Sequence, residues 1–370
     1  MSFIRFAPSR CRHGVGSQRG NGVEIVKRMG SWIAVLLAFT VLASEAAAQP
    51  CTSGTSQCRS DFVLSSGKSI PIYGSFPLEY NEGIDRVVIV VHGSDRNADD
   101  YFDRLVAATS AEERLNNTLL VAPFFKTAEE SPSATEHYWS SGGWKVGNRS
   151  VDDPGRFSSF DAMNELVEGI CSTGIFPRLQ TVVIIGHSAG GQFVNRYAAG
   201  GAGCPNPAIA LRYIVMNPSS YLYASNQRWL DGAFRVPTTC SGYDEYKYGL
   251  DDLNAYMTRV GVSQLQENLF SRSTFYLAGE EDTVVSDSLD TSCSGNLQGA
   301  NRLERLQNYF EYKTLFERWS NSIFRTVPGV GHSSSRMLLS DAAREYMFGE
   351  SPLDQREILL APIFLSVTAP

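Results

Sequence analysis

Ser188 stands in a sequence context that can make a serine nucleophilic. It is the central residue of Gly-His-Ser-Ala-Gly at positions 186–190. The β-branched run at 181–185 predicts a buried strand before this pentapeptide, and residues 191–198 predict a helix after it. A bare Gly-x-Ser-x-Gly also occurs by chance, but strand, tight turn and helix together indicate a nucleophile elbow. The hydroxyl would then lie at a helix N-terminus, where the dipole and free N–H groups favour negative charge.

A serine hydroxyl needs a base at neutral pH, and the base needs an acid that orients it. We expect His332 to be the base, because it follows the predicted last strand at 323–327 on a loop that can turn over the serine. We expect Asp282 to be the acid, because the turn that begins at Gly279 should bring it toward the site. Asp287 is one alternative acid, and Asp290 is the other.

The remaining histidines of the mature chain receive other interpretations. His187 adjoins the serine in the elbow, and we expect the local geometry to turn it away from the reaction. His92 ends a predicted strand near the place where an oxyanion would lie. His137 lies on a loop and is assigned no role.

From position 61 onward, predicted strands and helices alternate. Two strands at 61–64 and 69–73 suggest an antiparallel opening pair. The apolar strands that follow lie at 86–91, 118–122, 181–185, 212–216, 273–277 and 323–327. Helices are predicted at 99–108, 160–171 and 191–198. This order predicts an α/β fold in which a mostly parallel central sheet carries helices on both faces.

Residues 223–272 are too many for a simple crossover. The segment is rich in aromatic residues and is interrupted by Pro237 and Gly242, so we interpret it as a cap or lid insertion. The alternative is that it only enlarges the domain. The Gly- and Trp-rich loop at 138–144 either lines a pocket or packs over the sheet edge.

The first 48 residues have the features of a targeting segment. Basic residues precede the apolar run at 32–43, and alanines at 46–48 supply small residues for cleavage before Gln49. The apolar run is too short to span a bilayer, although a short anchor or a buried helix is the alternative. We therefore expect a signal peptide and upstream leader at 1–48, one domain at 49–370, and a secreted protein, extracellular or periplasmic.

Without residues 1–48, which hold six basic and two acidic residues, the formal net charge falls from −7 to −11. An acidic chain has no broad attraction to nucleic acid or to anionic lipid, so neither is an expected partner. The sequence leaves the oligomeric state open.

Six cysteines remain after the leader, and an even number in an exported chain predicts three disulfides. Cys51 and Cys58 are expected to close a small loop. We expect Cys240 to join Cys293, because the first lies in the aromatic insertion and the second follows the acid turn. Cys171 would then pair with Cys204. Metal binding is the competing use, but no C-x-x-C pair supports it.

The elbow, the His-Gly at the end of the strand at 86–91, the Gly-x-x-Asp turn and the late histidine resemble the serine esterases and lipases of the α/β-hydrolase superfamily. The resemblance covers about 61–348. It implies the α/β-hydrolase fold, with the aromatic-rich insertion as its cap, and a Ser188–His332–Asp282 triad that needs no metal or organic cofactor. It also implies an oxyanion hole formed by the N–H groups of Ala189 and Ser94. Here His-Gly-Ser-Asp replaces the family's HGGG run, so the second donor departs from the family pattern.

The resemblance implies a hydrolase of small or polymeric carboxylic esters that works through an acyl-enzyme. A peptidase or amidase is the first alternative, because the elbow does not distinguish esters from amides. A non-catalytic binding protein on the same fold is less consistent with an intact serine, histidine and acid. Acyl transfer to an acceptor alcohol is the last alternative.

Overall fold

The computed structural model describes residues 49–152, 157–172, 174–286, 288–316 and 321–349. The chain divides into two units, Met1–Ala47 and Ala48–Pro370. All described residues belong to the second unit, and the predicted signal peptide and leader at 1–48 lie outside them.

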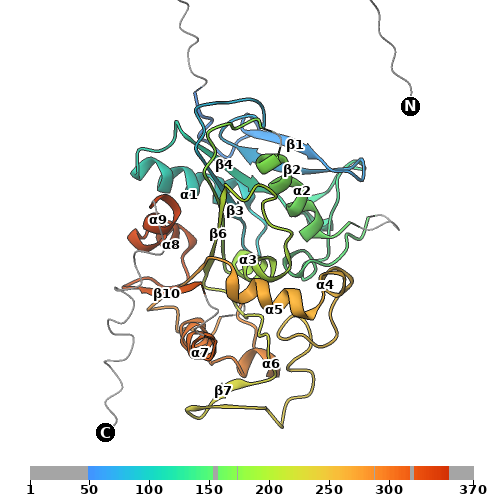
Figure 1. Ribbon diagram of the computed structural model, residues 1–370, viewed down its shortest axis with the longest axis vertical. Coiled ribbons are helices and arrows are strands. Elements are labelled where there is room, and N and C mark those ends of the chain that lie inside the picture. Colours follow the sequence, from blue (N-terminus) through green and yellow to red (C-terminus); the bar gives the residue numbers. More distant parts are fainter. Residues whose placement is uncertain (1–48, 153–156, 173, 287, 317–320, 350–370) are drawn as a thin grey trace, which may run out of the picture. The chain divides into compact units, whose positions relative to one another are not determined.

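An eight-stranded sheet in the order β1-β2-β4-β3-β5-β6-β9-β10 carries the fold (Figure 1). Its strands are β1 (Arg59–Val63), β2 (Ser69–Gly74), β3 (Arg86–Val91), β4 (Thr118–Pro123), β5 (Thr181–His187), β6 (Ala210–Met216), β9 (Thr274–Gly279) and β10 (Ser322–Val327). β2 pairs antiparallel with β1 and with β4, whereas the pairs from β4 to β10 are parallel. The mostly parallel sheet expected from the sequence is confirmed.

Helices cover both faces of the sheet (Figure 1). They are α1 (Ala98–Ala111), α2 (Ser159–Ser172), α3 (Ala189–Gly200), α7 (Arg302–Thr314), α8 (Ser334–Leu338) and α9 (Asp341–Phe348). Every residue of β3 is buried, because its side chains alternate between two cores. Val87 and Ile89 pack in the core that contains residues of α2, α3 and α7. Val88 and Val90 pack in the core that contains residues of α1, α8 and α9.

Residues 223–272 form a β7–β8 hairpin, a long loop and two helices. The elements are β7 (Arg228–Leu230), β8 (Ala233–Arg235), α4 (Ala255–Val260) and α5 (Val262–Ser271). Several of their aromatic residues lie inside the main core: Tyr223 meets Tyr309 of α7 edge to face, and Tyr256 meets Phe160 of α2 in the same way. The segment is therefore anchored to the helices beneath it through buried aromatic contacts.

Three disulfides join Cys51 to Cys58, Cys171 to Cys204 and Cys240 to Cys293. This is the pairing expected from the sequence.

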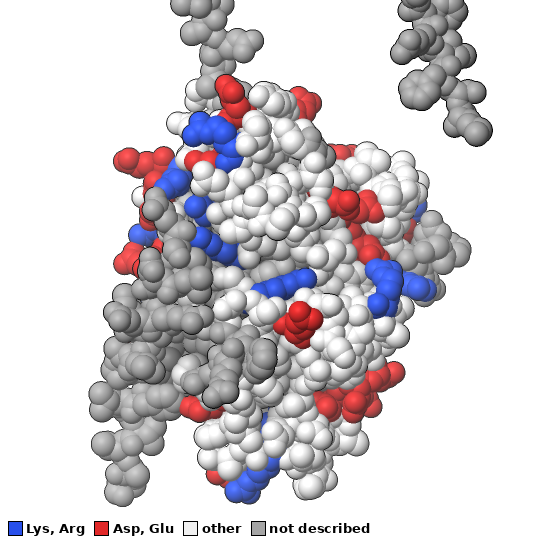
Figure 2. Space-filling model, in the orientation of Figure 1, with Lys and Arg blue, Asp and Glu red and all other residues white. Residues whose placement is uncertain are grey.

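On the face shown in Figure 2, acidic and basic side chains are scattered among uncharged residues.

Candidate active site

The turn between β5 and α3 holds Ser188 in a conformation that a non-glycine residue seldom adopts, with φ 58° and ψ −117°. Two glycines make the turn possible. A Cβ on Gly186 would collide with the Gly190 carbonyl, and a Cβ on Gly190 would collide with the Val91 carbonyl of β3. The backbone approach of strand and helix therefore excludes any side chain at these two positions.

The structure brings Ser188, His332 and Asp282 into one hydrogen-bonded chain. His332 Nε2 lies 3.0 Å from Ser188 Oγ, and His332 Nδ1 lies 2.7 Å from Asp282 Oδ2. The three residues follow β5, β9 and β10, and the carboxyl ends of these parallel strands meet at one edge of the sheet. Asp282 accepts a hydrogen bond from Nδ1–H, which leaves the Nε2 lone pair free to accept the serine proton.

Two further side chains bind Asp282. Asn217 donates from Nδ2 to Oδ2 at 2.6 Å, and Arg302 lies with Nη1 3.5 Å from Oδ1. The Arg302 side chain is fully buried. Burial alone would raise the pKa of Asp282, but the hydrogen bonds from His332 and Asn217 and the charges of His332 and Arg302 hold it below its usual value. The carboxylate is therefore charged and fixed in orientation.

Sequence reasoning missed both partners of the acid. Asn217 directly follows β6 and has a positive φ of 47°, which asparagine tolerates better than most residues. An asparagine directly after a predicted buried strand was the available signal. Arg302 begins α7, twenty residues after the acid. Nothing local in the sequence indicates its contact.

The expectation for His187 was wrong. Its ring centre lies 4.6 Å from that of His332, its Nδ1 lies 3.4 Å from the Tyr101 hydroxyl, and it lines the same cleft as Ser188. Strand alternation is the reason: Ile185, two residues earlier on β5, faces the α1 core, and His187 faces the same side. Burial, followed by the nearby His332 charge, lowers the pKa of His187 well below its ordinary value.

His92 fixes the loop that carries Ser94. Its ring is fully buried, with Nδ1 2.9 Å from the Gly93 carbonyl, and the Phe125 N–H donates to Nε2 at 3.1 Å. These partners assign the proton to Nδ1, and burial lowers the pKa of His92 to about 4. Trp144, from the loop at 138–144, packs on the ring at a centroid distance of 4.6 Å. That loop is thus packed through its buried tryptophans.

A polar cleft of about 260 Å³ opens beside the serine. Its lining residues are Gly93, Ser94, Asp95, Asn97, Tyr101, Arg104, His187, Ser188, Ser288, His332 and Ser334.

Of the alternative acids, Asp290 binds Lys247 and Tyr248 instead of a histidine. Asp287 lies outside the described residues.

No family model and no curated protein matches the chain. Among solved structures, it is similar to the poly(3-hydroxybutyrate) depolymerase LpqC from Bordetella parapertussis, with 21% identity and a TM-score of 0.57 over 80% of this chain and 91% of that one. It is also similar to poly(aspartic acid) hydrolase-1 from Sphingomonas sp. KT-1, with 21% identity and a TM-score of 0.55 over 78% of this chain and 98% of that one. Both are of the α/β-hydrolase type.

This chain has the α/β-hydrolase fold. In this α/β-hydrolase fold, the N-terminus of α3 lies at the serine, and Ser188 makes no side-chain capping bond there. The first-turn N–H groups of α3, including that of Ala189, can therefore face a ligand. Ser94 lines the same cleft, so both expected oxyanion donors belong to segments that border the serine.

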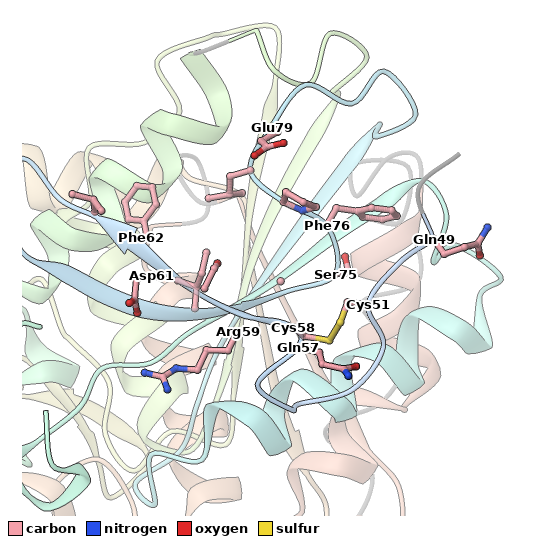
Figure 3. Close-up of a pocket in the computed structure, with 16 residues that line it drawn as sticks. Gln49, Cys51, Gln57, Cys58, Arg59, Asp61, Phe62, Ser75, Phe76 and Glu79 are labelled. Carbon is pink, nitrogen blue, oxygen red and sulfur yellow. A yellow bond between two sulfur atoms is a disulfide. The ribbon is translucent and has the colours of Figure 1, made fainter. Parts of the chain in front are cut away.

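A larger hollow of about 520 Å³ lies against β1 and β2 of the α/β-hydrolase fold (Figure 3). Cys51 and Cys58, which form a disulfide, line it together with Arg59, Asp61 and Glu79. It shares no lining residue with the cleft at Ser188. Size alone does not make a reactive site, so we assign the chemistry to the smaller cleft.

Within the described ranges, no group of three or more histidine, cysteine, aspartate or glutamate side chains could hold a metal ion. In the same residues, no helix is both long enough and apolar enough to cross a membrane.

The Cys240–Cys293 disulfide joins the 223–272 segment to the loop that follows Asp282, and it spans 53 residues. Replacing both cysteines by serine should lower the free energy of unfolding by about 4 kcal/mol in the loop-entropy model. We expect the reactivity of Ser188 toward a fluorophosphonate to fall at temperatures where far-UV circular dichroism is unchanged, because the acid loop loosens first. The Cys51→Ser/Cys58→Ser variant, whose loop spans 7 residues, is the matched control and should keep the reactivity of Ser188. Equal labelling of Ser188 in both double variants would contradict this expectation.

Proposed function

We propose that this protein is a secreted serine hydrolase that cleaves carboxylic esters. The observation that carries the proposal is the continuous hydrogen-bonded chain from Ser188 through His332 to Asp282 at a strained elbow. The name of the similar poly(3-hydroxybutyrate) depolymerase, which acts on a polyester, supports ester chemistry. The signal peptide predicted at 1–48 and the three disulfides support secretion.

The geometry supports acyl transfer in two steps. Ser188 Oγ attacks the ester carbonyl carbon while His332 Nε2 takes the serine proton, and Asp282 stabilises the resulting imidazolium. The N–H groups of Ala189 and Ser94 stabilise the tetrahedral oxyanion. His332 then gives its proton to the leaving alcohol, and the acyl group stays on Ser188. Water gives a proton to His332 and attacks the acyl carbon. The bond from that carbon to Ser188 Oγ then breaks, Oγ takes the proton from His332, and the acid leaves.

The polar cleft favours a short or hydroxylated acyl group. Its walls are formed largely by serine, asparagine and arginine side chains. In one wall, Arg104 donates a hydrogen bond to Ser334 Oγ at 2.9 Å. A long alkyl chain would displace water from these polar groups without replacing their hydrogen bonds. We therefore place the preferred substrates among short-chain esters and oligomers of small hydroxy acids.

An ester panel tests this proposal. We expect kcat/KM for acetyl and 3-hydroxybutyryl esters to exceed that for decanoyl esters of the same alcohol by about tenfold or more, since unpaired polar wall groups penalise the long chain. Initial rates of acid release, measured by titration, check the order and separate hydrolysis from acyl transfer to an alcohol. A preference for decanoyl esters, or no release of acid from any ester, would overturn the proposal.

Amide hydrolysis is the second candidate, because the other similar structure is named a poly(aspartic acid) hydrolase. The bonds along that polymer are amides, and the same serine chemistry cleaves them. Amide analogues of the same acids therefore belong in the panel. Faster cleavage of an aspartyl oligomer than of the acetyl ester would favour this second candidate.

A further inference from the structure

A second serine, histidine and aspartate form a hydrogen-bonded chain outside the cleft. Ser66 Oγ lies 2.7 Å from His137 Nε2. His137 Nδ1 lies 3.1 Å from Asp152 Oδ2 and 3.2 Å from Oδ1. Ser66 lies in the turn between β1 and β2, and the other two residues lie on the loop between β4 and α2. The atoms follow the same order as in the chain from Ser188 through His332 to Asp282.

The His137 ring is held rigidly in this position. Its backbone N–H donates to the Ser69 carbonyl of β2 at 2.9 Å, and Ser69 N–H donates to the Thr135 carbonyl at 2.9 Å. Phe157 stacks on the ring at a centroid distance of 5.3 Å. The His137 side chain is 2% exposed. These contacts fix the imidazole next to the turn that carries Ser66.

Asp152 fixes the proton of His137 on Nδ1. Burial would raise the pKa of Asp152, but hydrogen bonds from Lys68, Ser150 and His137 lower it to about 2, so the group is a carboxylate. A carboxylate accepts hydrogen bonds only, and the Nδ1–H of His137 is therefore the donor. The Nε2 lone pair then faces Ser66 and accepts its hydroxyl proton.

Ser66 itself is exposed, which leaves its oxygen open to a reagent. The Lys68 N–H donates to Ser66 Oγ at 3.3 Å, and the Lys68 ammonium binds Asp152 at 2.6 Å. One backbone N–H donor, that of Lys68, thus faces the oxygen at which an alkoxide develops, and the Lys68 ammonium is bound to the aspartate. The neighbouring Ser65 is also exposed, but it bonds to the carboxylate of Glu165. A carboxylate is a weaker base than the imidazole that Ser66 contacts.

We propose that Ser66 is a second activated serine and that small activated esters acylate it. Ser66 Oγ attacks the carbonyl carbon of an aryl acetate, and the Oγ–H proton passes to His137 Nε2. The bond from carbon to the aryl oxygen breaks, and the aryl oxide leaves and recovers the proton from His137. The products are acetyl-Ser66 and a phenol. This modification site is separate from the proposed ester-hydrolase function, and its readout is stable acylation without turnover.

Mass spectrometry of the Ser188→Ala variant after exposure to 4-nitrophenyl acetate tests the proposal. We expect acetyl-Ser66 to form about 10²-fold faster than acetyl-Ser65, which is the lower end of what a positioned general base supplies. Ser65, adjacent and exposed, is the internal control for accessibility. Peptide fragmentation distinguishes the two positions. Equal acetylation of Ser65 and Ser66, or none at Ser66, would overturn the proposal.

His137→Gln supplies the second arm. Glutamine keeps hydrogen-bonding groups at the position but removes the base, so acetylation of Ser66 should fall to the level of Ser65. Unchanged acetylation of Ser66 in a folded His137→Gln protein would refute the role of the histidine. Far-UV circular dichroism and the ester activity of His137→Gln with Ser188 intact report on folding. If the variant does not fold, the ratio of acetylation at Ser66 to acetylation at Ser65 in the Ser188→Ala protein decides the question by itself.

Discussion

Ser188→Ala should lower kcat for ester hydrolysis by about 10⁶-fold, because the nucleophile and its base act as one unit. The Ser188 hydroxyl bonds to His332 Nε2, and alanine removes that bond and the attacking atom together. The fold should persist, since alanine fits the space of the serine. Steady-state kinetics on acetyl esters and the melting temperature check the two halves of this prediction.

Labelling with a fluorophosphonate provides the control for that variant. The reagent should modify Ser188 in the wild-type protein. The fraction of esterase activity that is lost should equal the fraction of Ser188 that is labelled. Loss of activity with Ser188 unmodified, or full hydrolysis by folded Ser188→Ala, would rule out the serine as nucleophile. His332→Ala should match the serine variant in its loss of kcat.

Asp282→Asn should lower kcat by about 10⁴-fold, because an amide at this position favours the wrong tautomer of His332. Nδ1 of His332 lies 2.7 Å from Asp282 Oδ2, and this contact currently fixes the proton on Nδ1. The change also leaves the buried Arg302 without its charged partner. We therefore expect a loss of about 3 kcal/mol in the free energy of unfolding.

Kinetics well below the melting temperature separate these two effects. Asp290→Asn is the matched control: it removes a half-buried carboxylate that binds Lys247 and Tyr248, so it should destabilise the protein while kcat stays close to wild type. If Asp290→Asn were the crippling substitution and Asp282→Asn nearly neutral, the acid would be wrongly assigned.

The sequence predicts the buried strands β3, β4 and β9 well because their residues are nearly all β-branched or apolar. The run at 86–91 coincides with β3, and 181–185 lies within β5. The order of the strands in the sheet is not predictable in this way. β4 lies between β2 and β3 in the sheet, and no local sequence pattern indicates that position. The hairpin β7–β8 was also missed, because its strands have only three residues each.

The site was predictable where its residues follow strands and unpredictable where they arrive from elsewhere. Ser188, Asp282 and His332 could be placed at strand ends by position alone. Arg302 contacts Asp282 because α7 packs beside the acid loop. In the sequence, nothing distinguishes it from an arginine on the protein surface. The same applies to His137, which contacts Ser66, and to Asp152, which contacts His137. The hydrogen bond from the His137 N–H to Ser69 of β2 holds this loop beside the turn that carries Ser66.

The strand order has a consequence for the time at which activity appears during refolding. His332 follows β10, which lies at the edge of the sheet and pairs with β9. Ser188 sits at the end of β5, 144 residues earlier in the chain. Pairings between distant residues form slowly because the chain must first close a long loop. Turnover should therefore return after the bulk of the β-sheet signal, and the lag would measure the time that the His332 loop needs to reach Ser188.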